Sequence, residues 1–515
     1  MRRLIRSLAT TLAVLCLPLS AAAKVTEVEG PIPVTPTSTI FGASEVPGAS
    51  LSIDLDQAGY IEQEYFVGGT ANAWRHDPSG AVSVLKADIP YTTRIIVRRP
   101  RDGARFSGVM HFEPIHPSQG GTTHWLTTGR YMMAHGDIYV AAAIGDDAPS
   151  RRISAKGLVP IAQSQVAKWF DPARYAPLHW PDEDGIRYQV MAEIGALLRS
   201  DRPDNPLRGL KVRAMLVGGW SFTGSVQRTF IDEGFHDRFR LPDGRPIFDG
   251  YLIGISSRWN GGGYVPLNSE EPPVANDDPR RTLKPIDVPV IEFLSEFEVA
   301  TGPGPQRPDS DAEIGAHRLY ELGGVIHSAS MTDPDASRAE RPNLAQLVAK
   351  GYPLAKVAGE TAATRCPLPI SDVPHGALAR AALDNLRHWV LDEVSPPHAP
   401  PLATDANGKV LRDATGNPTG GIPVAEFDVP RARYGLPGGD DPACVGRRGR
   451  PTFVRDDLSR VDLIDRYGNA AGFVARYDEA IDRMVSERWL LPDDAAQLEA
   501  KARADAQRLF ATGRR

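Results

Sequence analysis

One serine in the chain lies where an apolar strand pattern meets a helical pattern. The run at 214–217 is continuously apolar, Gly219, Trp220 and Ser221 follow it, and apolar residues at helical spacing come next. A serine raised on a tight strand-to-helix turn can attack a carbonyl carbon, as in the G-x-S-x-G arrangement. The positions two before and two after such a serine approach each other, so their side chains must be small. Gly219 meets this requirement, whereas Thr223 stands where glycine is usual.

The helix predicted after Ser221 also supplies groups that stabilise negative charge. Its first backbone N–H groups and the positive end of its dipole point toward the position of the serine hydroxyl. We predict that the backbone N–H of Phe222 binds an oxyanion. The simpler alternative is a serine that only caps the helix after a buried strand.

Two carboxylates follow a later apolar strand pattern. The run at 288–294 is followed by Glu296 and Glu298, both in the predicted loop beyond the strand end. A nucleophilic serine needs a carboxylate there to orient a histidine, and we favour Glu298 as this acid, with Glu296 as the alternative. Either carboxylate could instead be a solvated loop residue or the ion-pair partner of an arginine.

A histidine follows the last predicted strand. The strand pattern at 317–322 leads through two glycines to His327, which completes the chain order serine, acid, histidine. His327 is the predicted base that takes the proton from Ser221. His375, just before a predicted helix, is a rival that is better read as a residue lining a substrate pocket. The other histidines lack metal-ligand spacing, so no metal and no cofactor are predicted.

The elements around these residues alternate between strands and helices. Several strand patterns are continuously apolar, which is typical of strands covered on both faces. The sequence therefore predicts an α/β fold with a mostly parallel sheet and helices on both faces. The expected strands are 94–98, 109–113, 138–144, 214–218, 250–255, 288–294 and 317–322, and the expected helices are 188–200, 224–233, 377–393 and 493–509.

The remaining segments divide the chain into a leader and one domain. Residues 1–23 have a basic start, an apolar run and a small-residue end, as in a secretory signal peptide, so we expect a periplasmic or secreted protein. Residues 24–515 are expected to form a single domain. Its parts are an N-terminal β-rich cover at 24–90, insertions at 146–185 and 258–286, a turn-rich segment at 396–451 and a C-terminal helix at 486–515.

Composition excludes some functions. The chain has 58 basic and 64 acidic residues and a formal net charge of -6, without the basic excess of a nucleic-acid binder. The leader's apolar run is too short to span a bilayer and no other run is long enough, so no stable membrane insertion is expected. Cys366 and Cys444 remain after leader removal, and we expect a disulfide between them in an oxidising compartment. The sequence leaves the oligomeric state open.

The chain resembles a large family of bacterial α/β-hydrolase-domain proteins that includes secreted serine esterases. The likeness extends over nearly all of the mature chain. It is carried by 58–71, 171–175, the turn at Ser221, 295–299, 321–327, 411–422 and 490–495. The resemblance implies the α/β-hydrolase fold and a triad of Ser221, Glu298 (or Glu296) and His327.

This chain departs from the family pattern at two places. Phe222 and Thr223 stand where the family usually has glutamine and a small residue, and the segment 109–117 also differs. The loop after that strand is expected to provide the second oxyanion N–H, which we place at Ile115 because the preceding proline has none. Trp220 beside the nucleophile suggests an apolar substrate pocket, although buried aromatic residues are more often core.

These expectations describe a serine hydrolase that cleaves small carboxylic esters through an acyl-enzyme. A lactonase or a peptidase could use the same triad. A secreted binding protein that kept the fold without the chemistry is the alternative of a different class, because a fold does not guarantee a function.

Overall fold

A computed structural model describes most of the chain. The described residues are 25–117, 121–145, 163–256, 263–268, 270–272, 274–275, 277–301, 306–325, 327, 341–351, 368–435 and 453–511. The predicted signal peptide at 1–23 and both cysteines of the predicted disulfide, Cys366 and Cys444, lie outside these residues. Within them, no helix has the length and apolar character needed to cross a membrane.

The centre of the molecule is a nine-stranded sheet with the order β1-β2-β3-β5-β4-β6-β7-β8-β9. The six strands from β5 to β9 in this order run parallel, and β1, β2 and β3 are antiparallel to their neighbours. The strands are β1 Val25–Glu29, β2 Tyr60–His76, β3 Val82–Pro100, β4 Val109–Pro114, β5 Ile138–Ala142, β6 Ala214–Trp220, β7 Gly250–Gly254, β8 Val290–Ser295 and β9 His317–Leu322. All seven predicted strands are present, and the prediction of a mostly parallel sheet is confirmed.

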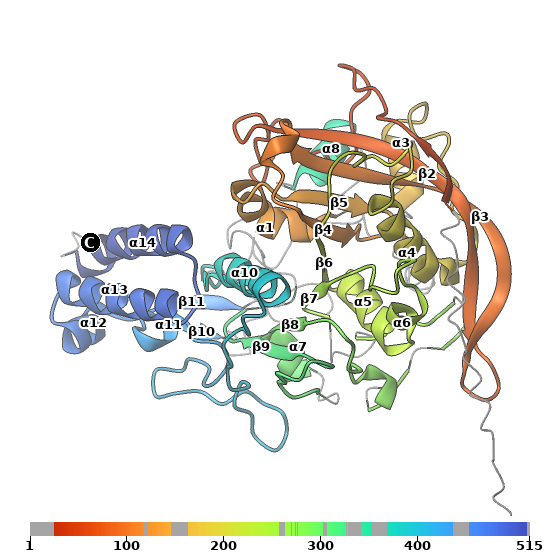
Figure 1. Ribbon diagram of the computed structural model, residues 1–515. Helices are drawn as coiled ribbons and strands as arrows, with labels where there is room; N and C mark the ends of the chain where they lie inside the picture. The colour runs from red at the N-terminus through yellow and green to blue at the C-terminus, as the bar shows by residue number, and fades with distance from the viewer. Residues whose placement is uncertain are drawn as a thin grey trace, which may run out of the picture.

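Helices cover both faces of this sheet, as predicted (Figure 1). α1 and α10 lie on one face, and α4, α5 and α6 on the other. The described α-helices are α1 Thr123–Ala134, α3 Gln163–Phe170, α4 Arg187–Leu198, α5 Phe222–Asp232, α6 Phe235–Arg238, α7 Glu296–Thr301, α8 Pro342–Ala349, α10 His375–Asp392, α11 Ala425–Asp428, α12 Arg460–Tyr467, α13 Ala470–Ser486 and α14 Pro492–Phe510. The four predicted helices correspond to α4, α5, α10 and α14.

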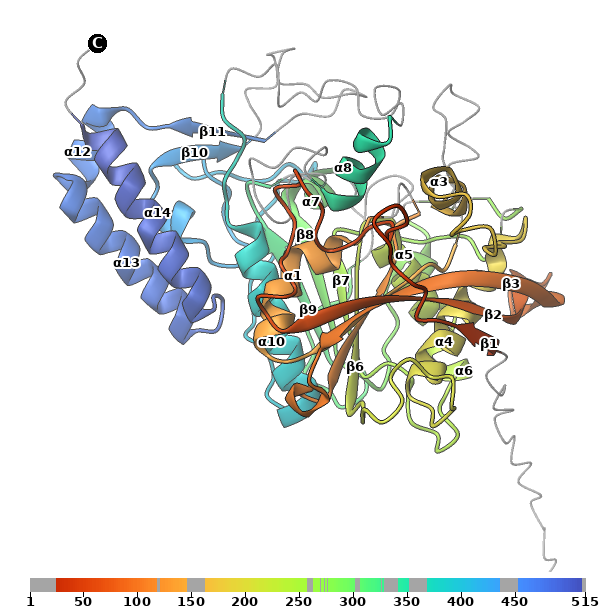
Figure 2. The ribbon, with the colours of Figure 1, turned by 90° about the horizontal axis from the view of Figure 1, so that it is seen from above.

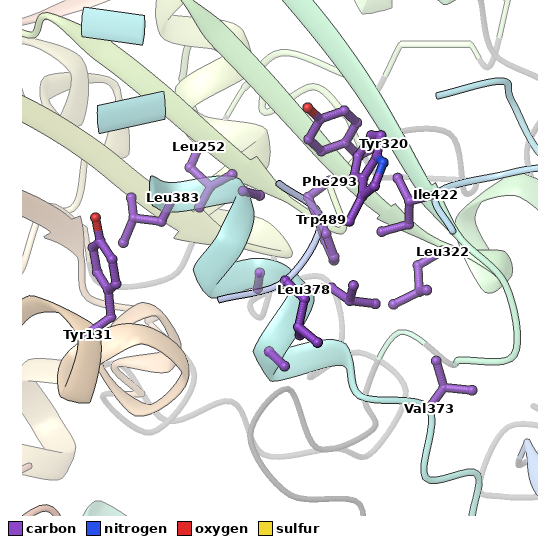
Figure 3. Packing of buried hydrophobic residues seen from close by; sticks show 14 of the residues in the cluster. Tyr131, Leu252, Phe293, Tyr320, Leu322, Val373, Leu378, Leu383, Ile422 and Trp489 are labelled. Atoms are coloured by element: carbon purple, nitrogen blue, oxygen red, sulfur yellow. The ribbon is translucent and has the colours of Figure 1, made fainter. Parts of the chain in front are cut away.

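Buried side chains fix α10 against the sheet. Leu378 and Leu383 belong to one core cluster with Leu252 of β7 and Phe293 of β8 (Figure 3). Each fully buried side chain of this kind contributes roughly 1.5–3 kcal/mol by leaving water. This packing places the first residue of α10, His375, near the ends of β6 and β8.

The N-terminal part of the chain is β-rich, but it does not form a separate cover. β2 and β3 pair along their whole length as a long antiparallel hairpin, and β3 pairs with β5 inside the main sheet. The segment predicted as a cover at 24–90 therefore extends the sheet itself. The first residues of β3, 82–88, are exposed or half-buried, whereas 93–98 are buried, because the far end of the hairpin extends beyond the helical layers (Figure 1).

The two predicted insertions contain short helical pieces where the structure describes them. In 146–185, α3 packs with α8 in a small cluster that includes Phe41 and Phe66. The 3₁₀ turn η2 at Asp184–Ile186 ends just before α4. In 258–286, the described part contains the 3₁₀ turn η3 at Pro279–Arg281.

The C-terminal segments form a lobe beside the sheet (Figure 2). It contains α11 to α14 and a two-stranded sheet of β10 Ala432–Gly435 and β11 Val454–Asp457. Asp372, in the loop before α10, is buried and pairs with Arg431 at 2.5 Å, Arg455 at 2.7 Å and Lys501 of α14 at 2.6 Å. These cations keep the pKa of the Asp372 carboxyl far below its ordinary value despite burial. One carboxylate thus joins the lobe to the start of α10.

Candidate active site

The turn between β6 and α5 has a strained backbone. Ser221 adopts φ 59° and ψ -121°, a conformation that non-glycine residues rarely adopt and that costs about 1–3 kcal/mol. Its N–H donates to the carbonyl of Gly254 in the neighbouring strand at 2.9 Å. A Cβ on Gly219 would lie 2.2 Å from Nε2 of Gln227 and 3.1 Å from the carbonyl carbon of Thr223, so any other residue here would displace the Gln227 side chain and crowd the turn. The predicted strand-turn-helix setting of Ser221 is confirmed.

Thr223 stabilises this turn in a way that glycine cannot. Its hydroxyl accepts from the backbone N–H of Trp220 at 2.9 Å and lies 3.0 Å from the carbonyl oxygen of the same residue. Thr223 is buried, so these contacts are shielded from water. The following Gly224 is close to Ser256, and a Cβ there would lie 2.7 Å from the Cβ of that serine. The departure from the usual glycine is therefore accommodated within the turn.

A hydrogen-bonded chain connects Ser221 to a histidine and a carboxylate. The hydroxyl oxygen of Ser221 lies 2.8 Å from Nε2 of His327, and Nδ1 of His327 lies 2.5 Å from Oε1 of Glu298. The three side chains follow the carboxyl ends of β6, β9 and β8, which meet at one edge of a parallel sheet. Phe297 holds the imidazole from the side, with ring centroids 5.9 Å apart at 61°. Nδ1–H donating to the carboxylate leaves Nε2 able to accept from the hydroxyl.

The two candidate acids point to different partners. Oε2 of Glu298 accepts from the backbone N–H of Ser295 at 3.0 Å and from its hydroxyl, and the Glu298 side chain is fully buried. Glu296 accepts from the N–H of Gly324 at 2.7 Å and forms an ion pair with Arg412. Burial raises the pKa of Glu296, and Arg412 opposes the increase. Glu298 therefore lies beside His327, while Glu296 links β8 to the turn-rich segment.

The two predicted oxyanion donors differ in their surroundings. Phe222 is the first residue of α5, where a backbone N–H has no partner within the helix. The N–H of Ile115 instead donates to the carbonyl of Ala142 at 2.8 Å. The prediction for Ile115 is wrong because the parallel pairing of β4 with β5 continues one residue beyond the end of β4.

Trp220 and His375, predicted to contact substrate, lie in the core instead. Trp220 is 2% exposed and His375 is 3% exposed. The indole ring packs edge-to-face on the imidazole of His375, which stacks on Phe293 at a centroid distance of 5.2 Å. Among the described residues, neither ring nitrogen of His375 has a hydrogen-bond partner. Burial lowers the pKa of His375 to about 4, while Glu298 acts in the opposite direction.

Among the described residues, one group of side chains has the composition of a metal site. His236, Asp237 and Asp287 bring possible ligand atoms within 4.8 Å of one another. Arg240 already pairs with Asp237 at 2.6 Å and with Asp287 at 2.7 Å. A guanidinium in this position neutralises the carboxylates that a cation would need, so the group is better explained as an ion-pair cluster.

The role of the Thr223 hydroxyl can be tested by substitution. Thr223→Val keeps the shape of the side chain but leaves a buried backbone N–H without a partner, which should lower the free energy of unfolding by about 1–3 kcal/mol. Thr223→Ser should stay close to the wild type. Denaturant unfolding measures both values, and equal stability of the valine variant and the wild type would contradict this role.

The low pKa of His375 predicts a pH dependence of stability. The unfolded histidine binds a proton below its ordinary pKa of 6.5, while the folded one stays neutral down to about 4, so stability falls as the pH drops through this window. Between pH 8 and pH 5 this group should cost the wild type about 2 kcal/mol. His375→Phe should remove that part of the loss in denaturant unfolding at the two pH values. Equal losses in both proteins would refute the assignment.

Comparisons with known proteins agree with this architecture. The family model described as "Alpha/beta hydrolase domain" matches residues 28–500. None of the curated proteins matches the chain.

Solved structures that match the chain include several hydrolases. Esterase Est22 is 12% identical with a TM-score of 0.29 and covers 59% of this chain and 82% of its own. An esterase from Rhizomucor miehei is 10% identical with a TM-score of 0.28, covering 56% and 82%. A dienelactone hydrolase-like promiscuous phosphotriesterase from metagenomic libraries is 15% identical with a TM-score of 0.27, covering 63% and 98%. Because the family model spans nearly the whole described chain, this protein belongs to the alpha/beta hydrolase domain family.

Proposed function

We propose that the protein is a serine hydrolase that cleaves carboxylic esters through an acyl-enzyme on Ser221. The observation that supports this most directly is the hydrogen-bonded chain from Ser221 through His327 to the buried Glu298. The strained backbone at Ser221 adds to it, because this strain raises the hydroxyl at the edge of the sheet. No cofactor is needed for this chemistry.

The reaction follows from the positions of the three side chains. The hydroxyl oxygen of Ser221 attacks the ester carbonyl while His327 takes its proton. The N–H of Phe222 stabilises the resulting oxyanion. The C–O bond to the leaving group then breaks, and His327 gives its proton to the departing alcohol. Water, deprotonated by the same histidine, then attacks the acyl-enzyme. The bond between the acyl carbon and the Ser221 oxygen breaks, His327 returns the proton to that oxygen, and the acid is released. The carboxylate of Glu298 orients the imidazole and stabilises the imidazolium in both steps.

Removal of either the nucleophile or the base tests the proposal. Ser221→Ala and His327→Ala should each lower kcat for p-nitrophenyl acetate and butyrate by about 10³-fold or more, since such residues act as one unit. A fluorophosphonate probe should label the wild type at one equivalent and leave Ser221→Ala unlabelled. If the folded wild type neither hydrolyses these esters nor takes the label, the binding-protein alternative replaces the enzyme. A panel of lactones and peptides on the active protein separates the remaining alternatives.

The two carboxylates give a matched pair of variants. Glu298→Gln should lower kcat by about 10³–10⁴-fold, because an amide cannot stabilise the imidazolium or hold its tautomer. Glu296→Gln removes a carboxylate of the same length two residues away, and its effect should be mainly on stability through the lost pair with Arg412. Steady-state kinetics with p-nitrophenyl butyrate measures both. If Glu296→Gln lowers kcat more than Glu298→Gln does, Glu296 and not Glu298 is the acid.

A further inference from the structure

A buried carboxylate joins the two ends of the loop between β4 and α1. Glu113 is 1% exposed and is the last residue but one of β4, directly before the loop at 115–122. Its Oε1 accepts from the backbone N–H of His124 at 2.8 Å, and its Oε2 accepts from the backbone N–H of Trp125 at 3.0 Å. Both N–H groups belong to the first turn of α1, which follows the loop. One side chain therefore holds the start of α1 against the end of β4.

This carboxylate takes the place of an ordinary helix cap. Thr122 occupies the N-cap position of α1, but its hydroxyl accepts from none of the described N–H groups of the first turn. Threonine is a good capping residue, so this helix could be capped locally and without a buried charge. Burial raises the pKa of Glu113 to about 7, although the hydroxyl of Tyr139, the two N–H groups and Arg98 lower it. What the carboxylate adds to a local cap is the link between α1 and β4.

Neighbouring strands hold the Glu113 carboxylate in one orientation. The hydroxyl of Tyr139 on β5 donates to Oε2 at 2.6 Å. The guanidinium carbon of Arg98 on β3 lies 4.6 Å from the ring centroid of Trp125 and 5.1 Å from that of Tyr139. Arg98 and Tyr139 are fully buried. Because both carboxylate oxygens are bonded and their partners are fixed, Glu113 sets the position of α1 relative to the sheet.

The loop that Glu113 closes meets the candidate site through one side chain. The backbone N–H of His116 donates to the carbonyl of Gly121 at 2.9 Å, which draws the two ends of the loop together. The half-buried imidazole of His116 approaches the half-buried ring of Phe222, with centroids 6.0 Å apart at 67°. Phe222 follows Ser221 and carries the N–H that we propose binds the oxyanion. The loop therefore contacts the residue that must be placed most accurately.

The ring of Phe222 has a second contact that does not depend on the loop. The guanidinium carbon of Arg187, the first residue of α4, lies 5.6 Å from the centroid of this ring, and Arg187 is 1% exposed. A buried side chain on a packed helix gives the ring a fixed support. The other contact comes from His116, so the position of the loop influences how Phe222 lies beside Ser221.

We propose that Glu113 is a positioning residue for the candidate active site. Its carboxylate fixes α1 against β4, the loop between them holds His116, and His116 holds Phe222 so that the N–H of Phe222 faces the oxyanion. The inference rests on the proposed function and adds to it a residue that does not touch the substrate. A displacement of about 1 Å at a reacting group can lower the rate about 100-fold, so a small movement of the loop is sufficient.

The variant Glu113→Gln tests this role with a side chain of nearly the same size. An amide has a single acceptor oxygen, so the N–H of either His124 or Trp125 loses its acceptor. We expect kcat for p-nitrophenyl butyrate to fall about 10–100-fold with KM nearly unchanged, because the loss is in the transition state. Inhibition by 1-butaneboronic acid, which forms a tetrahedral adduct with a reactive serine, should weaken by a similar factor.

Two further variants separate positioning from stability. Glu426 in the C-terminal lobe is also buried and accepts from the hydroxyl of Tyr477 at 2.8 Å. Glu426→Gln is therefore the matched control, and it should lower the free energy of unfolding without changing kcat or the inhibition. Tyr139→Phe removes one bond to Glu113 but leaves both contacts with α1, so it should retain most of kcat. A fall in kcat as large in Glu426→Gln as in Glu113→Gln would overturn the positioning role.

A double-mutant cycle tests the route through His116. His116→Ala should lower kcat by itself, and the addition of Glu113→Gln should lower kcat little further, because both changes release the same contact with Phe222. If the two effects multiply, Glu113 acts independently of His116 and the proposal is wrong. His116 lies in a loop and is half-buried, so His116→Ala also serves if Glu113→Gln does not fold. The kcat of the wild type in folded His116→Ala would then overturn the proposal.

The design separates two kinds of failure. If Glu113→Gln and His116→Ala both keep the kcat of the wild type, and Ser221→Ala abolishes the activity, the hydrolase proposal stands and only the positioning role fails. If the wild type neither hydrolyses the ester nor takes the phosphonate label, the proposed function itself fails, and the positioning role fails with it.

Discussion

The backbone conformation of Ser221 is the constraint on which the rest of the site depends. A non-glycine residue at φ 59° persists only when its surroundings prevent relaxation. On one side of β6, Gly218 lies against the imidazole of His124, and on the other side Gly219 lies against Gln227. Gly254 of β7 faces the Trp220 ring, where a Cβ would come within 1.9 Å. Gly218 and Gly219 let side chains of α1 and α5 pack directly on β6, and Gly254 makes room for the Trp220 ring at the end of the same strand; this packing holds the turn.

The same edge of the sheet separates two carboxylates that are almost adjacent in sequence. α7 begins at Glu296, and residues two apart on a helix point about 200° apart around its axis. Glu298 therefore turns toward His327, and Glu296 toward Gly324 and Arg412. Glu298 orients the candidate base His327. Glu296 forms an ion pair with Arg412 and so binds the turn-rich segment to the start of α7. The short helix thus decides which glutamate lies beside His327.

Much of this arrangement is visible in the sequence, and the exceptions have physical reasons. Buried parallel strands give continuous apolar runs, so β6, which leads to Ser221, was predictable from its local pattern. The strand before His327 has a mixed sequence, and it was found from the two glycines and the histidine that follow it. Ile115 was misassigned because pairing beyond a strand end depends on the register of a neighbouring strand. Trp220 and His375 were predicted to contact substrate but lie in the core. Residue type alone does not show whether an aromatic ring near the end of a strand faces a substrate or packs inward. The contact of Arg187 with the Phe222 ring could not be predicted from the sequence, because only the fold brings these two residues together.

The two unusual residues after the nucleophile act together. Thr223 replaces the flexibility of glycine with a hydroxyl contact to Trp220, so the turn keeps its conformation. With the turn held in this way, the preceding position can carry a large aromatic ring. The ring of Phe222 then presents a π face to the guanidinium of Arg187, and an amide side chain has no such face. The departures from the family pattern therefore conserve the geometry at Ser221 and change its electrostatic surroundings.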